Sequence, residues 1–129
     1  MATDTMTNTQ GVTEYAHMLL KVSDIDRSRH FYKDLLGFTP RNAKPLPDGR
    51  PFVPFLQGLA LTSGGVEKSP QIDHIAFKAK DVPAIAQRLK AANVKFDRDL
   101  HDGLYGLTIY VYDPDGNMIE LYDETAKMG

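Results

Sequence analysis

The chain has 129 residues, of which 42% are hydrophobic and 25% charged, values typical of one globular domain with its own core. A formal net charge of -2 and a pI of about 6.0 exclude the basic surface expected of a nucleic-acid-binding protein. No run reaches the roughly 18 apolar residues of a membrane span, and the lack of cysteine excludes disulfides, thiolate metal sites and a cysteine nucleophile.

Both ends of the chain are polar and are expected to lie outside the folded core. Residues 1–11 contain neither the positively charged segment nor the apolar segment of a secretory signal, so we interpret them as a disordered tail. Residues 125–129 form a second short tail, and residues 12–124 are expected to fold as a single domain. With no signal and no disulfide framework, the expected compartment is the cytoplasm, without a membrane or nucleic-acid partner.

The first half of the chain predicts a strand, a helix and three short strands. Residues 15–22 are apolar and strand-like, and the spacing of apolar residues predicts a helix over residues 24–36. Ser23 is expected to cap the start of that helix, and Gly37 to end it in a left-handed conformation. The three strands that follow are expected over residues 38–42, 52–56 and 59–62.

The second half repeats this order. A strand is expected over residues 72–79, followed by a helix that begins at Asp81, has Pro83 in its first turn and stops at Asn93. The repeat predicts an α+β fold of two tandem βαβββ modules that form a cupped, mostly antiparallel sheet with the helices outside. The modules would span residues 12–66 and 70–124, with the last three strands over residues 94–97, 107–112 and 118–122.

A metal-ligand residue type occurs at matching points of the two modules. His17 and His74 are 57 residues apart, and each is expected in the middle of an apolar strand. If a pseudo-twofold axis relates the modules, both imidazoles point to one place. Glu120 interrupts an apolar strand, where a buried carboxylate without a partner would cost several kcal/mol. Two histidines and a carboxylate form a facial triad typical of divalent metals; the alternatives are packing or surface histidines and a glutamate that faces water.

The turn Asp-Pro-Asp-Gly at residues 113–116 predicts which residue lies opposite Glu120. Proline in its second position and glycine in its fourth favour a three-residue hairpin loop. This register places Tyr110 opposite Glu120, with Cβ atoms about 5 Å apart. A two-residue loop would instead pair Tyr110 with Ile119 and turn the two side chains to opposite faces. His101 is expected in the loop before this hairpin.

Together these segments resemble the vicinal oxygen chelate superfamily, which includes glyoxalase I, bleomycin-resistance proteins, fosfomycin-resistance thiol transferases, methylmalonyl-CoA epimerase and extradiol dioxygenases. The resemblance covers residues 12–124. It implies that His17, His74 and Glu120 bind a divalent metal, and that the chain forms a homodimer whose metal sites combine modules from two subunits. The residues that carry it are 17–24, 28–38, 73–77 and 112–121.

Within this superfamily, the segment from His101 to Glu120 resembles the extradiol dioxygenases. Their signature has a histidine, a tyrosine nine residues later and a glutamate ten after the tyrosine, which here are His101, Tyr110 and Glu120. The histidine that they carry near the end of the first module has no counterpart in residues 56–63. This resemblance implies ring cleavage of a small aromatic diol. Fe(II) would be the favoured metal, with Mn, Ni or Zn possible, Tyr110 would bond the bound oxygen, and His101 would act as acid or base.

Two other classes of function stay open. A glyoxalase-like lyase or isomerase would need a second carboxylate in the first module, but the 57-residue offset from Glu120 points to Ser63. A thiol transferase that inactivates an antibiotic shares the three-ligand set. The third alternative is a metal-free protein that binds a small molecule. Aromatic candidates for the lining of the substrate cup are Phe52, Phe55, Phe77 and Tyr122.

Overall fold

The computed structural model describes residue 11, residues 15–67 and residues 72–129, so the tail predicted over residues 1–11 lies almost wholly outside the described residues. The α+β class is confirmed. In the described part of the chain, no helix is long and apolar enough to cross a membrane. In chain order the elements are β1 (Met18–Val22), α1 (Ile25–Arg29), the π-helix η1 (His30–Leu35), β2 (Val53–Pro54), β3 (Leu59–Ser63), β4 (Ile75–Lys78), α2 (Val82–Ala91), β5 (Phe96–Gly103), β6 (Gly106–Tyr112) and β7 (Met118–Asp123).

The strands form two sheets, one from each module, where the repeat had predicted one continuous cup. The first has the order β1-β3-β2 and the second the order β4-β7-β6-β5. Each sheet contains one parallel pair, β1 with β3 and β4 with β7, and its other pairs are antiparallel. β1 and β4 are therefore edge strands, and within the described chain neither meets the other. One continuous sheet across both modules would require further strand pairing along β1 and along β4.

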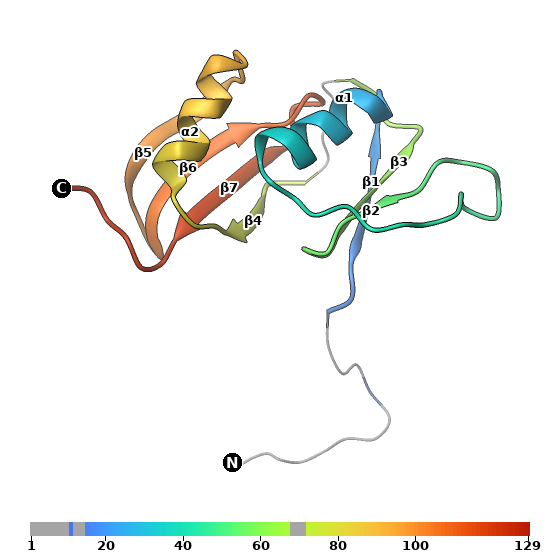
Figure 1. Cartoon of the computed structure of the whole chain (residues 1–129), viewed down its shortest axis with the longest axis horizontal. Coiled ribbons are helices and arrows are strands. Elements are labelled where there is room, and N and C mark those ends of the chain that lie inside the picture. Colours follow the sequence, from blue (N-terminus) through green and yellow to red (C-terminus); the bar gives the residue numbers. More distant parts are fainter. Residues whose placement is uncertain (1–10, 12–14, 68–71) are drawn as a thin grey trace.

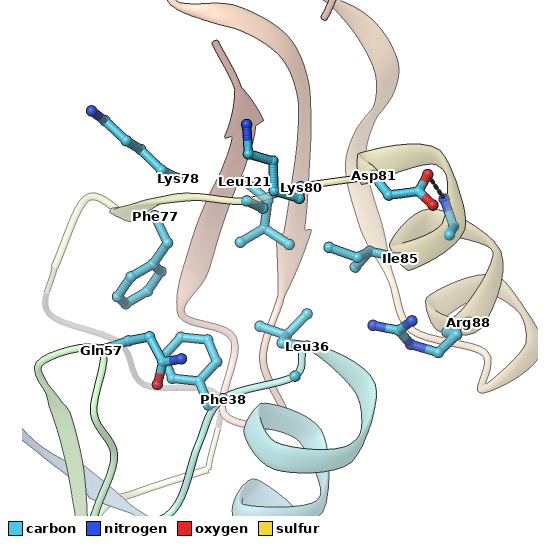
Figure 2. Close-up of a pocket in the computed structure, with 13 residues that line it drawn as sticks. Leu36, Phe38, Gln57, Phe77, Lys78, Lys80, Asp81, Ile85, Arg88 and Leu121 are labelled. Atoms are coloured by element: carbon cyan, nitrogen blue, oxygen red, sulfur yellow. Dashed lines mark hydrogen bonds between the residues drawn. The ribbon is translucent and has the colours of Figure 1, made fainter. Parts of the chain in front are cut away.

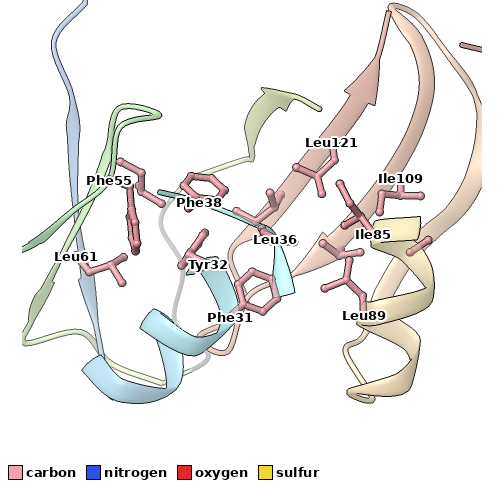
Figure 3. Packing of buried hydrophobic residues seen from close by; sticks show 14 of the residues in the cluster. Phe31, Tyr32, Leu36, Phe38, Phe55, Leu61, Ile85, Leu89, Ile109 and Leu121 are labelled. Atoms are coloured by element: carbon pink, nitrogen blue, oxygen red, sulfur yellow. The ribbon is translucent and has the colours of Figure 1, made fainter. Parts of the chain in front are cut away.

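A single hydrophobic core joins the two modules. Figure 1 shows the helix that starts with α1 between the two sheets, with α2 over the second sheet. Phe38, which follows this helix, packs against Phe55 of the first module and Phe77 of the second, with ring centroids 5.5 and 4.8 Å apart. Figure 3 shows Tyr32 and Leu36 between the two sets of core side chains. Phe55 is 3% exposed and Phe77 packs against the core, so both contribute to the packing between the modules, and their place in a substrate cup stays a prediction.

The first helix begins one residue later than the expected cap. The Asp24 side chain accepts a hydrogen bond from the Arg27 N–H at 3.1 Å, which makes Asp24 the N-cap in place of Ser23. Ser23 is engaged elsewhere, because its hydroxyl and its N–H both donate to the carboxylate of Asp115. The predicted stop is confirmed, since Gly37 has a φ of 85°, in the left-handed region.

The second helix, α2, has the predicted ends. The Asp81 side chain accepts from the Ala84 N–H at 3.4 Å, and Pro83 lies in the first turn. Asn93, with a φ of 60°, follows its last turn. The residues that it buries against the second sheet are Val82, Ile85, Ala86 and Leu89.

β1, β2 and β4 are shorter than predicted, and two further strands differ more. Residues 38–42 make only an isolated bridge between Pro40 and Phe55, because a proline has no N–H with which to extend a ladder. β5 is longer than the predicted strand at residues 94–97, and it carries His101 inside the strand and not in a loop. Register shifts on either side of Arg98 let the longer β5 stay paired with β6.

Candidate metal centre

Four of the five predicted site residues lie on one face of the second sheet. Glu120 on β7 alternates with the core residues Ile119 and Leu121, so its side chain points to the face away from the core. Tyr110 on β6 pairs with Glu120 and shares its face. The other two members of this cluster are His74, which directly precedes β4, and His101 on β5.

His74 and Glu120 form the centre of this cluster. The His74 Nε2 lies 3.3 Å from a carboxylate oxygen of Glu120, and the Glu120 side chain is only 9% exposed. The His74 Nδ1 lies 2.6 Å from the carboxylate of Asp73. A carboxylate accepts, so the Nδ1 N–H donates to Asp73, and Nε2 lies on the side of Glu120. A carboxylate that orients a histidine in this way is a common partner of metal-binding imidazoles, and the two donors fit a divalent ion.

The predicted register between Tyr110 and Glu120 is confirmed. The turn closes through a hydrogen bond from the Asp113 N–H to the Asn117 carbonyl at 2.9 Å, and Gly116 has a φ of 88°. The pKa of Tyr110 is raised by burial, by the negative charge of Glu120 and by a hydrogen bond to Glu120. The phenol therefore keeps its proton and serves as a donor beside the carboxylate.

His101 lies against Tyr110. The two rings stack with centroids 5.7 Å apart and an interplanar angle of 16°, and the His74 ring meets Tyr110 edge-on at 6.2 Å. The His101 Nδ1 lies 2.8 Å from the carbonyl oxygen of Asp99. Because a carbonyl only accepts, the Nδ1 N–H of His101 donates to it, which leaves Nε2 as the ring atom that can exchange a proton. An imidazole held in this way can serve as an acid or a base toward a substrate.

His17 is not part of this cluster. It is exposed and precedes β1 in the other sheet, as His74 precedes β4, so the prediction that both histidines lie in mid-strand is wrong. β1 starts one residue later, where the Met18 N–H donates to the Gly58 carbonyl. Among the described residues, no three histidine, aspartate or glutamate side chains lie together as a metal site. One chain therefore brings together two of the three predicted ligands.

The residue of the first module that is structurally equivalent to Glu120 is Ala60. The repeat offset had predicted Ser63 at this position. Ala76, two residues after His74, pairs with Glu120, whereas Leu19, two residues after His17, pairs with Ala60. The 57-residue offset pointed to the wrong residue because the segment between the paired strands is longer in the second module. Met18 pairs with Leu59, 41 positions later in the chain, whereas Ile75 pairs with Ile119, 44 positions later. Ala60 and His17 line one hollow of about 300 Å³. The first module thus supplies a histidine but no second carboxylate.

A larger hollow lies on the core side of the second sheet. Figure 2 shows its apolar floor, which includes Phe38, Phe77 and Leu121, with Lys80 and Arg88 at the rim. Its volume is about 530 Å³. Leu121 points away from the face of Glu120, so this hollow is separate from the metal centre. Its lining comes from both modules, a combination that the sequence pattern could not reveal.

Two charged residues near the centre were not identified from the sequence. Asp73 orients His74, and its position directly before the histidine was the available signal. Arg98 pairs with Tyr110 across β5 and β6, and only the register shifts of β5 place it there.

Comparison with known proteins identifies relatives over most of the chain. Residues 14–121 match the Glyoxalase/Bleomycin resistance protein/Dioxygenase superfamily. A lactoylglutathione lyase of Haemophilus influenzae is 30% identical over 128 residues, covering 88% of this chain and 95% of the relative. The metallothiol transferase FosB of Staphylococcus epidermidis is 31% identical over 126 residues, covering 90% and 85%.

Solved structures share the fold. The trypanothione-dependent glyoxalase I of Leishmania major has a TM-score of 0.71 and 25% identity, and the match covers 88% of each chain. The fosfomycin resistance protein FosX of Listeria monocytogenes, solved as a mutant with Mn(II) and a dihydroxypropylphosphonic acid, has a TM-score of 0.66 and 21% identity, covering 87% and 93%. The chain belongs to the glyoxalase/bleomycin resistance protein/dioxygenase superfamily, that is, the vicinal oxygen chelate superfamily.

Proposed function

We propose that this protein is a divalent-metal enzyme that binds a small substrate through two adjacent oxygens and catalyses a non-redox reaction. The reaction would be that of a glyoxalase-like lyase or isomerase, or the transfer of a thiol to an electrophilic substrate. The pair formed by His74 and Glu120, with Asp73 behind it, is the observation that carries this proposal. The lyase and thiol transferase relatives support the same two reaction types.

The metal would be held by His17, His74 and Glu120. When bound, the ion would act as a Lewis acid that polarises the two substrate oxygens. Three protein donors leave adjacent coordination positions free for a substrate. Because Ala60 occupies the position of a fourth donor, the three-donor set favours thiol transfer over a reaction that needs two carboxylates.

The three ligands would meet between two copies of the chain. β1 and β4 are edge strands, and each follows directly after one of the two histidines. An unpaired edge is a template for a strand of another chain. Tyr15 and Leu19, which share the face of His17, are 67% and 39% exposed, an apolar surface suited to burial. Pairing β1 of one copy with β4 of another would bring His17 to His74 and Glu120.

Tyr110 and His101 would carry the proton chemistry. The phenol of Tyr110 stays protonated beside Glu120 and can donate to a substrate oxygen. The free Nε2 of His101 can accept a proton and return it, and the stacked ring of Tyr110 restricts its orientation.

A second candidate function is extradiol-dioxygenase-like ring cleavage with Fe(II). It is favoured by the arrangement of His101 against Tyr110 and of Tyr110 opposite Glu120. The curated relatives favour the lyase and transferase reactions instead.

The test begins with metal analysis of protein purified without added metal, followed by loading with Mn²⁺, Ni²⁺, Zn²⁺ or anaerobic Fe(II). Each form is assayed with glutathione plus methylglyoxal, with thiols plus fosfomycin, and with a catechol panel. We expect one metal per chain, thiol-dependent turnover, and loss of both in His74→Ala and Glu120→Gln. Ring-opened catechol would establish the second candidate. Failure of every metal to bind, together with ligand binding that survives His74→Ala, would refute both and leave a metal-free binding protein.

A further inference from the structure

Arg98 lies in one row with the metal-centre residues across the second sheet. Arg98 on β5 pairs with Tyr110 on β6, and Tyr110 pairs with Glu120 on β7. Residues that pair directly across strands share a face of the sheet. With strands about 4.8 Å apart, the Cα atoms of Arg98 and Glu120 are about 10 Å apart. A guanidinium on β5, a phenol on β6 and a carboxylate on β7 thus lie next to one another on the same face of the sheet.

The placement of Arg98 depends on an irregularity in β5. Phe96 pairs with Val111 and Arg98 with Tyr110, so β5 contains one extra residue between them. A bulge of this kind changes the face on which the following side chains lie. The extra residue, Asp97, accepts a hydrogen bond from the Tyr112 hydroxyl at 2.8 Å. The bulge therefore directs a cation onto the face of Tyr110 and Glu120.

The charge of Arg98 is not used by the fold in the described part of the chain. Arg98 is exposed and, like Arg29 and Arg41, has no ion-pair or side-chain hydrogen-bond partner among those residues, whereas Arg27 and Arg50 form ion pairs and Arg88 donates to a backbone carbonyl. Of Arg29, Arg41 and Arg98, it is Arg98 that pairs across strands with Tyr110. Its two neighbouring carboxylates are engaged: Asp97 with Tyr112, and Asp99 with Lys90 on α2. The positive charge of Arg98 acts on the Tyr110 phenol, where it opposes the rise in pKa that Glu120 causes.

We propose that Arg98 binds an anionic group of the substrate, a carboxylate or a phosphonate, while the adjacent oxygens of that substrate face His74 and Glu120. The proposal rests on the proposed function of the same site and narrows its substrate class to small anions. A planar guanidinium presents paired donors that match the two oxygens of such a group, and this bond is stronger than a neutral one. Tyr110 lies between the two ends of the bound molecule.

The first experiment needs no metal. The uniformly ¹⁵N-labelled protein is titrated with inorganic phosphate and followed by nuclear magnetic resonance. We expect saturable shifts of the Arg98 Nε–H and of signals of Tyr110, and no shift of Tyr110 in Arg98→Gln. The control Arg29→Gln removes an exposed arginine of α1 and should respond as the native chain does. Absence of a shift at Arg98, or an unchanged response in Arg98→Gln, would overturn the proposal.

The second experiment uses two matched chelators with the Mn²⁺-loaded protein under anaerobic conditions. Catechol and 3,4-dihydroxybenzoate share two adjacent oxygens, but only the second carries a carboxylate. Calorimetry should show 3,4-dihydroxybenzoate binding about tenfold more tightly than catechol, with this advantage lost in Arg98→Gln and partly kept in Arg98→Lys. An equal advantage in Arg98→Gln would refute the role of Arg98 while leaving the proposed function intact, because catechol would still bind. A protein that binds none of the four divalent metals would count against the proposed function, and the phosphate titration, which needs no metal, would still decide on Arg98.

Discussion

At the scale of single residues, one buried phenol connects the two modules. Tyr32 has no exposed surface, and its hydroxyl donates to Asp113 at 2.7 Å. Asp113 in turn accepts from the backbone N–H groups of Asp115 and Asn117, which shapes the turn before β7. The register that puts Tyr110 opposite Glu120 therefore has a support in the first module.

Removing this hydroxyl should destabilise the protein. Tyr32→Phe leaves the ring in place but takes a partner from a buried carboxyl, and we expect the free energy of unfolding in urea to fall by about 1–3 kcal/mol. The control Tyr112→Phe removes an exposed hydrogen bond to Asp97 and should change it by less than about 0.5 kcal/mol. Equal effects of the two changes would contradict this role for Tyr32.

The same residue predicts a dependence of stability on pH. Burial, then the charge of Asp113 and its hydrogen bond, raise the pKa of Tyr32 well above its ordinary value of 10.0. The unfolded chain loses this proton first as the pH rises, so the stabilisation from Tyr32 is complete below pH 10 and declines above it. Unfolding curves between pH 9 and 11 should show a steeper loss for the native chain than for Tyr32→Phe.

At the scale of elements, α2 begins at a residue with an unusual backbone. Asp81 caps the helix from a left-handed conformation, with a φ of 54°. Aspartate tolerates this region better than most residues, and its side chain replaces a missing backbone partner at the helix start. α2 covers the second sheet, so its start contributes to the support of the strands that carry the metal centre.

Substitutions at Asp81 should separate the cap from the strain. Asp81→Ala loses the side-chain acceptor and must still adopt the left-handed conformation, and we expect a loss of about 2 kcal/mol in the free energy of unfolding. Asp81→Gly loses the acceptor too, but glycine adopts this conformation freely, so its loss should stay below about 1 kcal/mol. Thermal or urea unfolding measures both, and an alanine variant as stable as the glycine variant would show that strain is unimportant.

At the scale of the whole molecule, the distribution of ligands between two sheets predicts complementation. In a dimer with shared sites, His17 of one copy serves the site that holds His74 and Glu120 of the other. A mixed dimer of a His17→Ala chain and a His74→Ala/Glu120→Ala chain therefore keeps one site with all three ligands. Its other site lacks all three.

Co-expression with two different purification tags isolates this mixed dimer. We expect one metal per mixed dimer, with activity near half that of the native dimer, whereas each variant alone binds none. Metal-free mixed dimers, or a monomeric native chain that binds one metal, would contradict a site shared between copies.

The sequence alone determined those features of the fold that depend on residues close together in the chain, namely one strand register and the ends of α2. The turn at residues 113–116 predicted the pairing of Tyr110 with Glu120, and Asp81 and Asn93 marked the ends of α2, because turn and cap chemistry depends on residues close in the chain. The alternation along β7 likewise placed Glu120 opposite its core neighbours. These features follow from short-range geometry, so they do not depend on how the two modules are arranged.

Only the tertiary structure decided which distant residues meet. The cap moved from Ser23 to Asp24 because Ser23 bonds Asp115, and the vacant carboxylate position moved from Ser63 to Ala60 because the modules differ in length between paired strands. Long-range pairing also turned Arg98 toward Tyr110, through a bulge that no periodicity marks. The sequence named His17 and His74 as equivalent, and each does directly precede an edge strand, but β1 and β4 belong to separate sheets that are not paired with one another.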